Sequence, residues 1–218
     1  MDRDHLDSIA EDIRYEFNSV NEARDGAFQR SRQLIALCAR SIRAIHREEW
    51  TKAEELIGEA GAAAQQLKDG VDSYPNLYHA GYTQDALKEY VEASLVYSLI
   101  RNKAISGPVD LGVESRTWLN GLAEASTELR RRILDIIRHG HSQEAERLLT
   151  IMDDIYLVLV TFDFADAITG GLRRRTDTVR AVLERTRGDV TNSLRRAELQ
   201  KALETMEKRL ASQSTENE

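Results

Sequence analysis

The sequence predicts an all-α protein, built as a single antiparallel bundle of six or seven helices. Apolar residues recur at helical spacing along most of the 218-residue chain. Aromatic residues make up only 6% of the sequence, and no stretch of useful length shows the alternating pattern of a strand. This length suits one sizeable domain. We therefore expect one helical domain over residues 1–211, followed by a disordered polar tail at 212–218.

The N-terminal half is expected to hold three long helical segments. They span residues 4–45 (one helix, or two in succession), 51–70 and 83–102. The pattern Thr51-Lys52-Ala53-Glu54 is typical of a capping box, so the second segment is expected to begin at Thr51. Pro75 ends the helical pattern because proline disfavours helix in the residue before it. Residues 106–112 contain glycine and proline and are predicted to form a loop.

Helical periodicity resumes at Ser115 and continues to about Arg138, where Gly140 is the expected C-cap. Ser142 is expected to cap a helix that reaches Ile168. Two consecutive glycines at positions 170 and 171 then bend or interrupt the chain before a last helix.

Charge and cysteine content restrict the class of protein. The formal net charge of −7 argues against a protein that coats nucleic acid through general basicity. The single Cys38 cannot form an intramolecular disulfide, which fits a reducing compartment. No apolar stretch reaches membrane-spanning length, and the charged N-terminus does not resemble a signal peptide. We expect a cytoplasmic protein with no membrane partner.

The most informative stretch is the apolar segment that contains Glu89 and Glu92. At i,i+3 spacing these glutamates share one helix face with large apolar residues such as Val96. Carboxylates in such surroundings need a cation, a hydrogen-bond donor or a metal as partner. Glu124 and Glu128 form a second acidic pair at i,i+4 spacing on a later helix. Two acidic faces that converge would form a divalent-cation site.

The kind of metal can be narrowed by the histidines. A ferritin-like di-iron bundle needs Glu-x-x-His pairs, and none of the five histidines has a glutamate three residues before it. An all-carboxylate site remains, and oxygen ligands suit Mg²⁺ or Mn²⁺. The competing interpretation is that the glutamates pair with arginines across the bundle, for instance Arg130 or Arg101. The residues alone leave both interpretations open.

Several segments resemble the translin family. The motif Glu89-Tyr90-Val91-Glu92-Ala93, preceded by Asp85-Ala86-Leu87-Lys88, is similar to the Glu-Tyr-Val-Glu-Ala motif of translin-associated factor X and its archaeal homologues. Residues 40–47 resemble the family's basic early helix, and residues 119–132 resemble its Gly-x-Ala-Asp-x-x-x-Glu-Leu-x-Arg segment. The resemblance extends over residues 4–210.

The resemblance implies an all-α translin-like bundle in a hollow homo-oligomer, commonly an octamer. It also implies binding of single-stranded RNA, with single-stranded DNA as a second candidate, and a magnesium-dependent endoribonuclease activity. Glu89, Glu92 and Glu124 correspond to the catalytic, metal-binding carboxylates of that branch, and Glu128 to a nearby fourth carboxylate. The family has aspartate at the position of Glu124, so the carboxylate here reaches one methylene further.

Arginines on an early helix are the expected nucleic-acid contacts. Arg40, Arg43 and Arg47 follow one helix face at i, i+3 and i+7, a spacing that can track phosphates. They also correspond to the family's basic region. Two further arginine runs, at 130–132 and 173–175, are as consistent with solvated faces.

Three functions are therefore expected. The first is an endoribonuclease on single-stranded RNA. The second is a non-catalytic binder of single-stranded RNA or DNA with the same fold, in which the glutamates form ion pairs. The third is a structural bundle whose partner is another protein.

Overall fold

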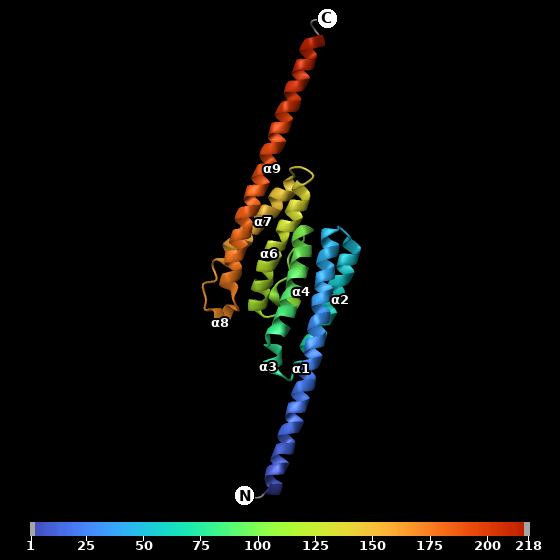
Figure 1. The fold of residues 1–218 in the computed structure, drawn as a ribbon, viewed down its shortest axis with the longest axis vertical. Coiled ribbons are helices and arrows are strands. Elements are labelled where there is room, and N and C mark those ends of the chain that lie inside the picture. Colours follow the sequence, from blue (N-terminus) through green and yellow to red (C-terminus); the bar gives the residue numbers. More distant parts are fainter. Residues whose placement is uncertain (1–2, 216–218) are drawn as a thin grey trace. The chain divides into compact units, whose positions relative to one another are not determined.

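The computed structural model describes residues 3–215, and these form nine helices and no strand (Figure 1). This confirms the all-α prediction. Six helices are long, and three (α3, α5 and α8) are single turns of four residues. In chain order they are α1 (Arg3–His46), α2 (Trp50–Asp69), α3 (Pro75–Tyr78), α4 (Gly81–Ile100), α5 (Pro108–Leu111), α6 (Ser115–Ile137), α7 (Gln143–Leu159), α8 (Asp166–Thr169) and α9 (Leu172–Thr215).

The chain divides into two compact units, Met1–Leu122 and Ala123–Glu218, and α6 begins in the first and continues into the second. In the first unit, α1 packs against both α2 and α4. The buried face of α2 includes three small side chains, Ala60, Ala63 and Ala64, which allow a neighbouring helix to come close. Leu34 of α1 and Leu87 of α4 are completely buried. Close helix approach thus gives α4 a fixed position.

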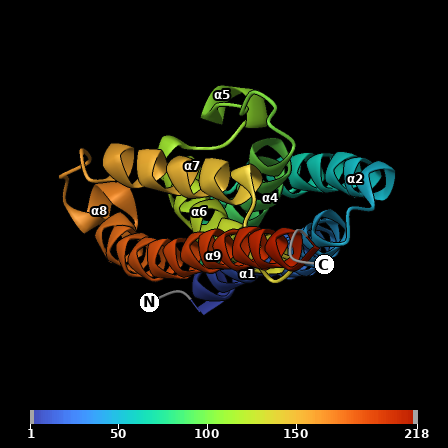
Figure 2. The same cartoon turned by 90° about the horizontal axis from the view of Figure 1, so that it is seen from above.

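In the second unit, α7 lies alongside α9 in both views (Figure 2). The buried residues of α7 and α9 recur at helical spacing and include Leu148, Met152, Val179 and Leu183. The second part of α6 is joined to α9 by Arg130, which donates one hydrogen bond to Thr186 at 3.0 Å and forms an ion pair with Asp189 at 2.8 Å.

The N-terminal helices differ in two ways from the expectation. The segment over residues 4–45 is one continuous helix, α1. The expected capping box at Thr51 is wrong, because the N-cap of α2 is Glu49 and Thr51 already lies inside the helix. The backbone N–H of Ala53 donates to the carbonyl of Glu49 at 2.9 Å, which places the first turn earlier. The predicted loop over 106–112 contains the single turn α5, which begins at a proline, a residue suited to a first helical position.

The C-terminal boundaries are partly as expected. Ser142 is confirmed as a cap, since its Oγ accepts a hydrogen bond from the backbone N–H of Glu144 at 3.2 Å. α7 ends at Leu159, short of Ile168, and the hydroxyl of Thr161 bonds the carbonyl of Val158 at 2.7 Å, an alternative to the helical ladder.

Gly170 and Gly171 adopt positive φ angles of 63° and 83°, which separate α8 from α9. The backbone of α9 remains helical to Thr215, four residues into the segment expected as a tail, and 216–218 lie outside the described residues. The division at residue 211 stays a prediction. Over the described residues, no helix combines the length and apolarity needed to cross a membrane.

Candidate metal centre

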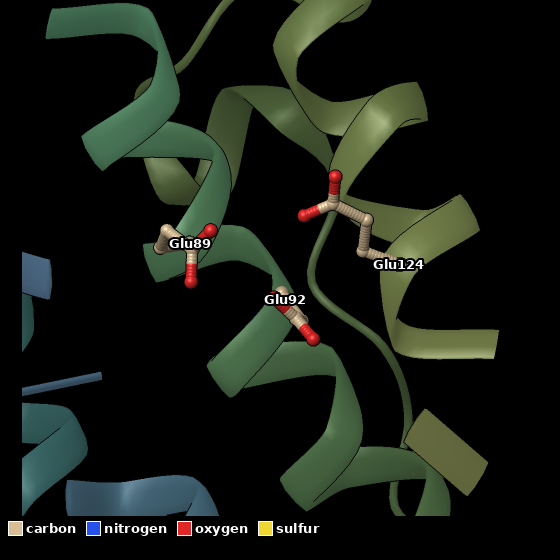
Figure 3. Close-up of side chains that lie close together, drawn as sticks. All are labelled: Glu89, Glu92 and Glu124. Atoms are coloured by element: carbon tan, nitrogen blue, oxygen red, sulfur yellow. The ribbon is translucent and has the colours of Figure 1, made fainter. Parts of the chain in front are cut away.

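Three carboxylates come together on α4 and α6. Glu89 and Glu92 project from α4 and Glu124 from α6, and each offers one oxygen that lies within 4.8 Å of the other two (Figure 3). All three side chains are half-buried. The structure therefore brings together the three residues that the sequence singled out, as a group that could bind a metal ion.

A single glycine explains why α6 comes so close to α4. A Cβ added to Gly121 would lie 2.6 Å from Cγ1 of Val91 and 3.0 Å from the backbone oxygen of Lys88. Only glycine permits this approach, because no side chain fits the gap. Glu124 follows Gly121 by three residues and so lies on the same helix face, directed at α4. The close contact thus fixes where the third carboxylate sits.

Cationic side chains lie beside Glu89 and Glu124. Lys88 Nζ lies 3.6 Å from Glu89, and the Nε–H of Arg175, on α9, donates to Oε1 of Glu124 at 3.1 Å. Arg175 also donates from Nη1 to the carbonyl of Gly170 at 3.2 Å. Sequence reasoning missed Arg175, because it belongs to an arginine run that was as consistent with a solvated face. The one available signal was that this run begins two residues after the glycine pair.

The specific arginine partners that the sequence suggested are wrong. Arg130 pairs with Asp189 instead, and Arg101 lies over the ring of Trp50 at 4.7 Å from its centroid. The glutamates do form ion pairs, but with other partners: Glu89 with Lys88 and Glu124 with Arg175.

Glu128, the expected fourth carboxylate, is not a member of the cluster. It lies one turn beyond Glu124 on α6 and forms an ion pair with Arg131 at 3.7 Å. Its role as a metal ligand stays a prediction.

A buried thiol, Cys38, senses the charges of Glu89 and Glu92. The Cys38 thiol is completely buried, and burial, followed by the charges of Glu89 and Glu92, raises its pKa from 9.0 to about 12. Burial also raises the pKa of Tyr90. A thiol with this pKa is an inert core group.

The oxygen separations can be compared with those around a small divalent cation. Ligands at about 2.1 Å in an octahedron lie about 3.0 Å apart in cis positions and about 4.2 Å apart in trans positions. The upper bound of 4.8 Å in the cluster is slightly larger, so small side-chain rotations would bring the oxygens into range. Three carboxylates without histidine or thiolate suit Mg²⁺ or Mn²⁺.

The predicted basic stripe is exposed. Arg40 and Arg43 lie on the last turns of α1, and Arg47 follows directly after its end. The backbone N–H of Arg47 bonds the carbonyl of Arg43 at 3.2 Å, which continues the helical turn. Within the described residues, no ion pair engages these three guanidinium groups. Their role in binding nucleic acid stays a prediction.

The fold and the site together define the class, an all-α protein with a three-carboxylate cluster held by two of its helices. No family model matches the chain. An uncharacterized protein of Methanocaldococcus jannaschii is 26% identical over 190 residues, which cover 86% of this chain and 83% of that protein.

Solved structures identify the family. The crystal structure of AfC3PO is similar with a TM-score of 0.79 and 31% identity, and the match covers 84% of this chain and 96% of that one. A structure of AfC3PO in a complex with duplex RNA has a TM-score of 0.71, with 84% and 95% covered. Apo-NeC3PO shares the fold, with a TM-score of 0.76 and 22% identity over 84% of this chain and 96% of that one. The chain belongs to the C3PO family, which is of the translin type.

Proposed function

We propose that this protein is a divalent-metal-dependent endoribonuclease that acts on single-stranded RNA within a hollow cytoplasmic homo-oligomer. The observation that carries the proposal is the convergence of Glu89, Glu92 and Glu124 on one point. RNA as the ligand class is supported by the relative of 31% identity that was solved with duplex RNA.

In this proposal Glu89, Glu92 and Glu124 hold the cation, and Glu128 is the nearby fourth carboxylate. A bound Mg²⁺ or Mn²⁺ would polarise a phosphoryl oxygen and activate a hydroxyl or water. Arg175 has a separate role. Its Nε–H donates to Oε1 of Glu124 at 3.1 Å, so its charge lies beside the point where phosphate charge would develop.

The RNA backbone is proposed to follow Arg40, Arg43 and Arg47. For single strands, each phosphate contact adds about 0.7 to the slope of log affinity against log salt. Replacing the three arginines with alanine should therefore weaken binding and lower that slope by about 2. The affinity of wild type and variant for a labelled oligonucleotide at several salt concentrations measures this change.

The deciding experiment is cleavage by a Glu89→Gln/Glu92→Gln variant, which keeps side-chain size and removes charge. Single-stranded RNA, duplex RNA and single-stranded DNA are each offered with Mg²⁺ or Mn²⁺. Wild type should cut single-stranded RNA, and the variant should lose at least about 100-fold in rate while still binding RNA. The matched control is Glu55→Gln/Glu59→Gln, two exposed glutamates of α2. Equal cleavage by wild type and the Glu89/Glu92 variant would show that the site is elsewhere.

A second candidate function is binding of single-stranded RNA or DNA without catalysis. The observation that favours it is that Lys88 and Arg175 already form ion pairs with Glu89 and Glu124. This function predicts nucleic-acid affinity that falls steeply with salt, no cleavage with any divalent ion, and no heat of Mn²⁺ binding in calorimetry.

A further inference from the structure

The N-terminal part of α1 extends beyond α2 and α4, its neighbours in the first unit (Figure 1). Residues 3–18, termed the α1 arm, contain no buried side chain, and the first buried residue of the helix is Ala27. A helical segment of this length is only marginally stable in water without tertiary packing, so the α1 arm is expected to pack against a partner.

The α1 arm carries an apolar stripe. Leu6, Ile9, Ile13 and Phe17 are exposed, by fractions between 42% and 66%. At 3.6 residues per turn these four side chains fall within an arc of roughly 80° on one helix face. An aligned stripe of this width is typical of a helix that packs against another helix.

The C-terminal part of α9 carries a second stripe. Its last buried residue among those whose burial is described is Val190, and residues 194–210, termed the α9 arm, are exposed throughout. Leu199, Leu203, Met206 and Leu210 follow the alternating spacing of four and three residues, with exposed fractions between 53% and 61%. They fall within an arc of roughly 60°, as in the seam of a coiled coil.

The charges on the two arms are opposite and indicate what covers each stripe. The α1 arm has five carboxylates and two arginines, whereas the α9 arm has five cationic side chains and three carboxylates. Pairing like arms would bring together like charges. Pairing an α1 arm with an α9 arm brings together opposite charges and buries both stripes.

We propose that the α1 arm of one copy of this chain packs as a helix pair against the α9 arm of a second copy. Each copy has one stripe of each kind, so the contact is heterologous and generates a ring when the rotation closes. The inference rests on the homo-oligomer of the proposed function and specifies a contact for it. The match to AfC3PO leaves 16% of this chain uncovered, so the chain has sequence beyond the shared fold.

The apolar part of the contact is tested with Leu203→Asn/Leu210→Asn, in the α9 stripe. Thr205→Asn is the matched control, because Thr205 lies outside the arc of the stripe. Mass measurements of the full chain over a dilution series report the assembly. Wild type should exceed the 24.7 kDa of one copy, and the stripe variant should dissociate at a concentration at least about tenfold higher. The Thr205 control should assemble as wild type does.

The partner is tested by exchanging charges between the arms. Asp12→Lys/Glu16→Lys reverses two carboxylates at one edge of the α1 stripe and should weaken assembly roughly fivefold. Adding Arg195→Glu/Arg209→Glu in the same chain should restore assembly to near the wild-type level. Three outcomes would overturn the pairing. The charge exchange restores no assembly, the wild type is a single copy at every concentration, or the variants change the melting temperature without changing the mass. Mass is the readout, so a failure of RNA cleavage leaves this test unaffected.

Discussion

Replacing Gly121 with alanine tests whether close approach of α6 to α4 positions the acidic cluster. The added methyl would lie 2.6 Å from Cγ1 of Val91, against an optimum of about 3.5–4.0 Å. The helices must therefore separate by about 1 Å, because Val91 is completely buried and its branched side chain has one preferred rotamer in a helix. Alanine gains about 1 kcal/mol in helix propensity, but overpacking costs about 3 kcal/mol at such a contact. The net loss should be about 2 kcal/mol.

The matched control is Gly58→Ala on α2, where an added Cβ meets nothing within 4 Å. This variant should gain about 1 kcal/mol. Denaturant unfolding of wild type and both variants measures the difference, and Mn²⁺ titration should show at least about a tenfold loss of affinity for Gly121→Ala alone. The reasoning is refuted if Gly121→Ala is as stable as wild type and binds Mn²⁺ equally well.

Three further predictions concern other residues. The pKa of Cys38 is about 12 in the folded protein and 9.0 in the unfolded chain, so the unfolded thiol ionises first as pH rises. The stability that the neutral thiol contributes is therefore fully present below pH 9.0 and is lost as pH rises toward about 12. Wild type should lose up to about 4 kcal/mol across this range relative to Cys38→Ala, and parallel unfolding curves would contradict it. Removing Arg175 frees Glu124 from a competing cation, so Arg175→Ala should bind Mn²⁺ several-fold more tightly while the exposed Arg174→Ala does not. Calorimetry showing the opposite order would reject the competition. Ser142→Ala removes the cap of α7 and should cost about 1 kcal/mol in thermal or denaturant unfolding.

Helical periodicity was sufficient to predict the long helices, because each follows an apolar pattern within its own segment. Exact starts were harder to predict. Thr51 and Glu54 have the composition of a capping box, yet α2 begins at Trp50, and its N-cap Glu49 makes no side-chain capping hydrogen bond. Backbone hydrogen bonds that begin at the carbonyl of Glu49 override the local side-chain preference. The end of α7 at Leu159 was not predicted because apolar residues continue beyond it.

Part of the candidate site could be predicted from sequence. The i,i+3 spacing places Glu89 and Glu92 on one face of α4, and the i,i+4 pair of Glu124 and Glu128 indicated a second acidic face. The resemblance to translin-associated factor X singled out Glu124 from that pair. The ion pair between Arg175 and Glu124 joins residues 51 positions apart. Helical periodicity relates residues three or four positions apart, so it cannot predict a contact between residues on two different helices. The glycine pair before α9 hinted only at a break in the chain, without indicating which arginine would reach α6.

The geometry of the cluster also predicts which length changes natural variants of this chain can tolerate. The connection between α4 and α6, residues 101–114, contains no buried residue, so insertions there leave both helices in register. One residue inserted between Gly121 and Glu124 would instead turn the carboxylate by roughly 100° about the helix axis, away from α4. Homologous chains should therefore vary freely in the length of this connection. The three-residue interval in α6 and the matching interval between Glu89 and Glu92 should stay constant wherever the cluster is kept.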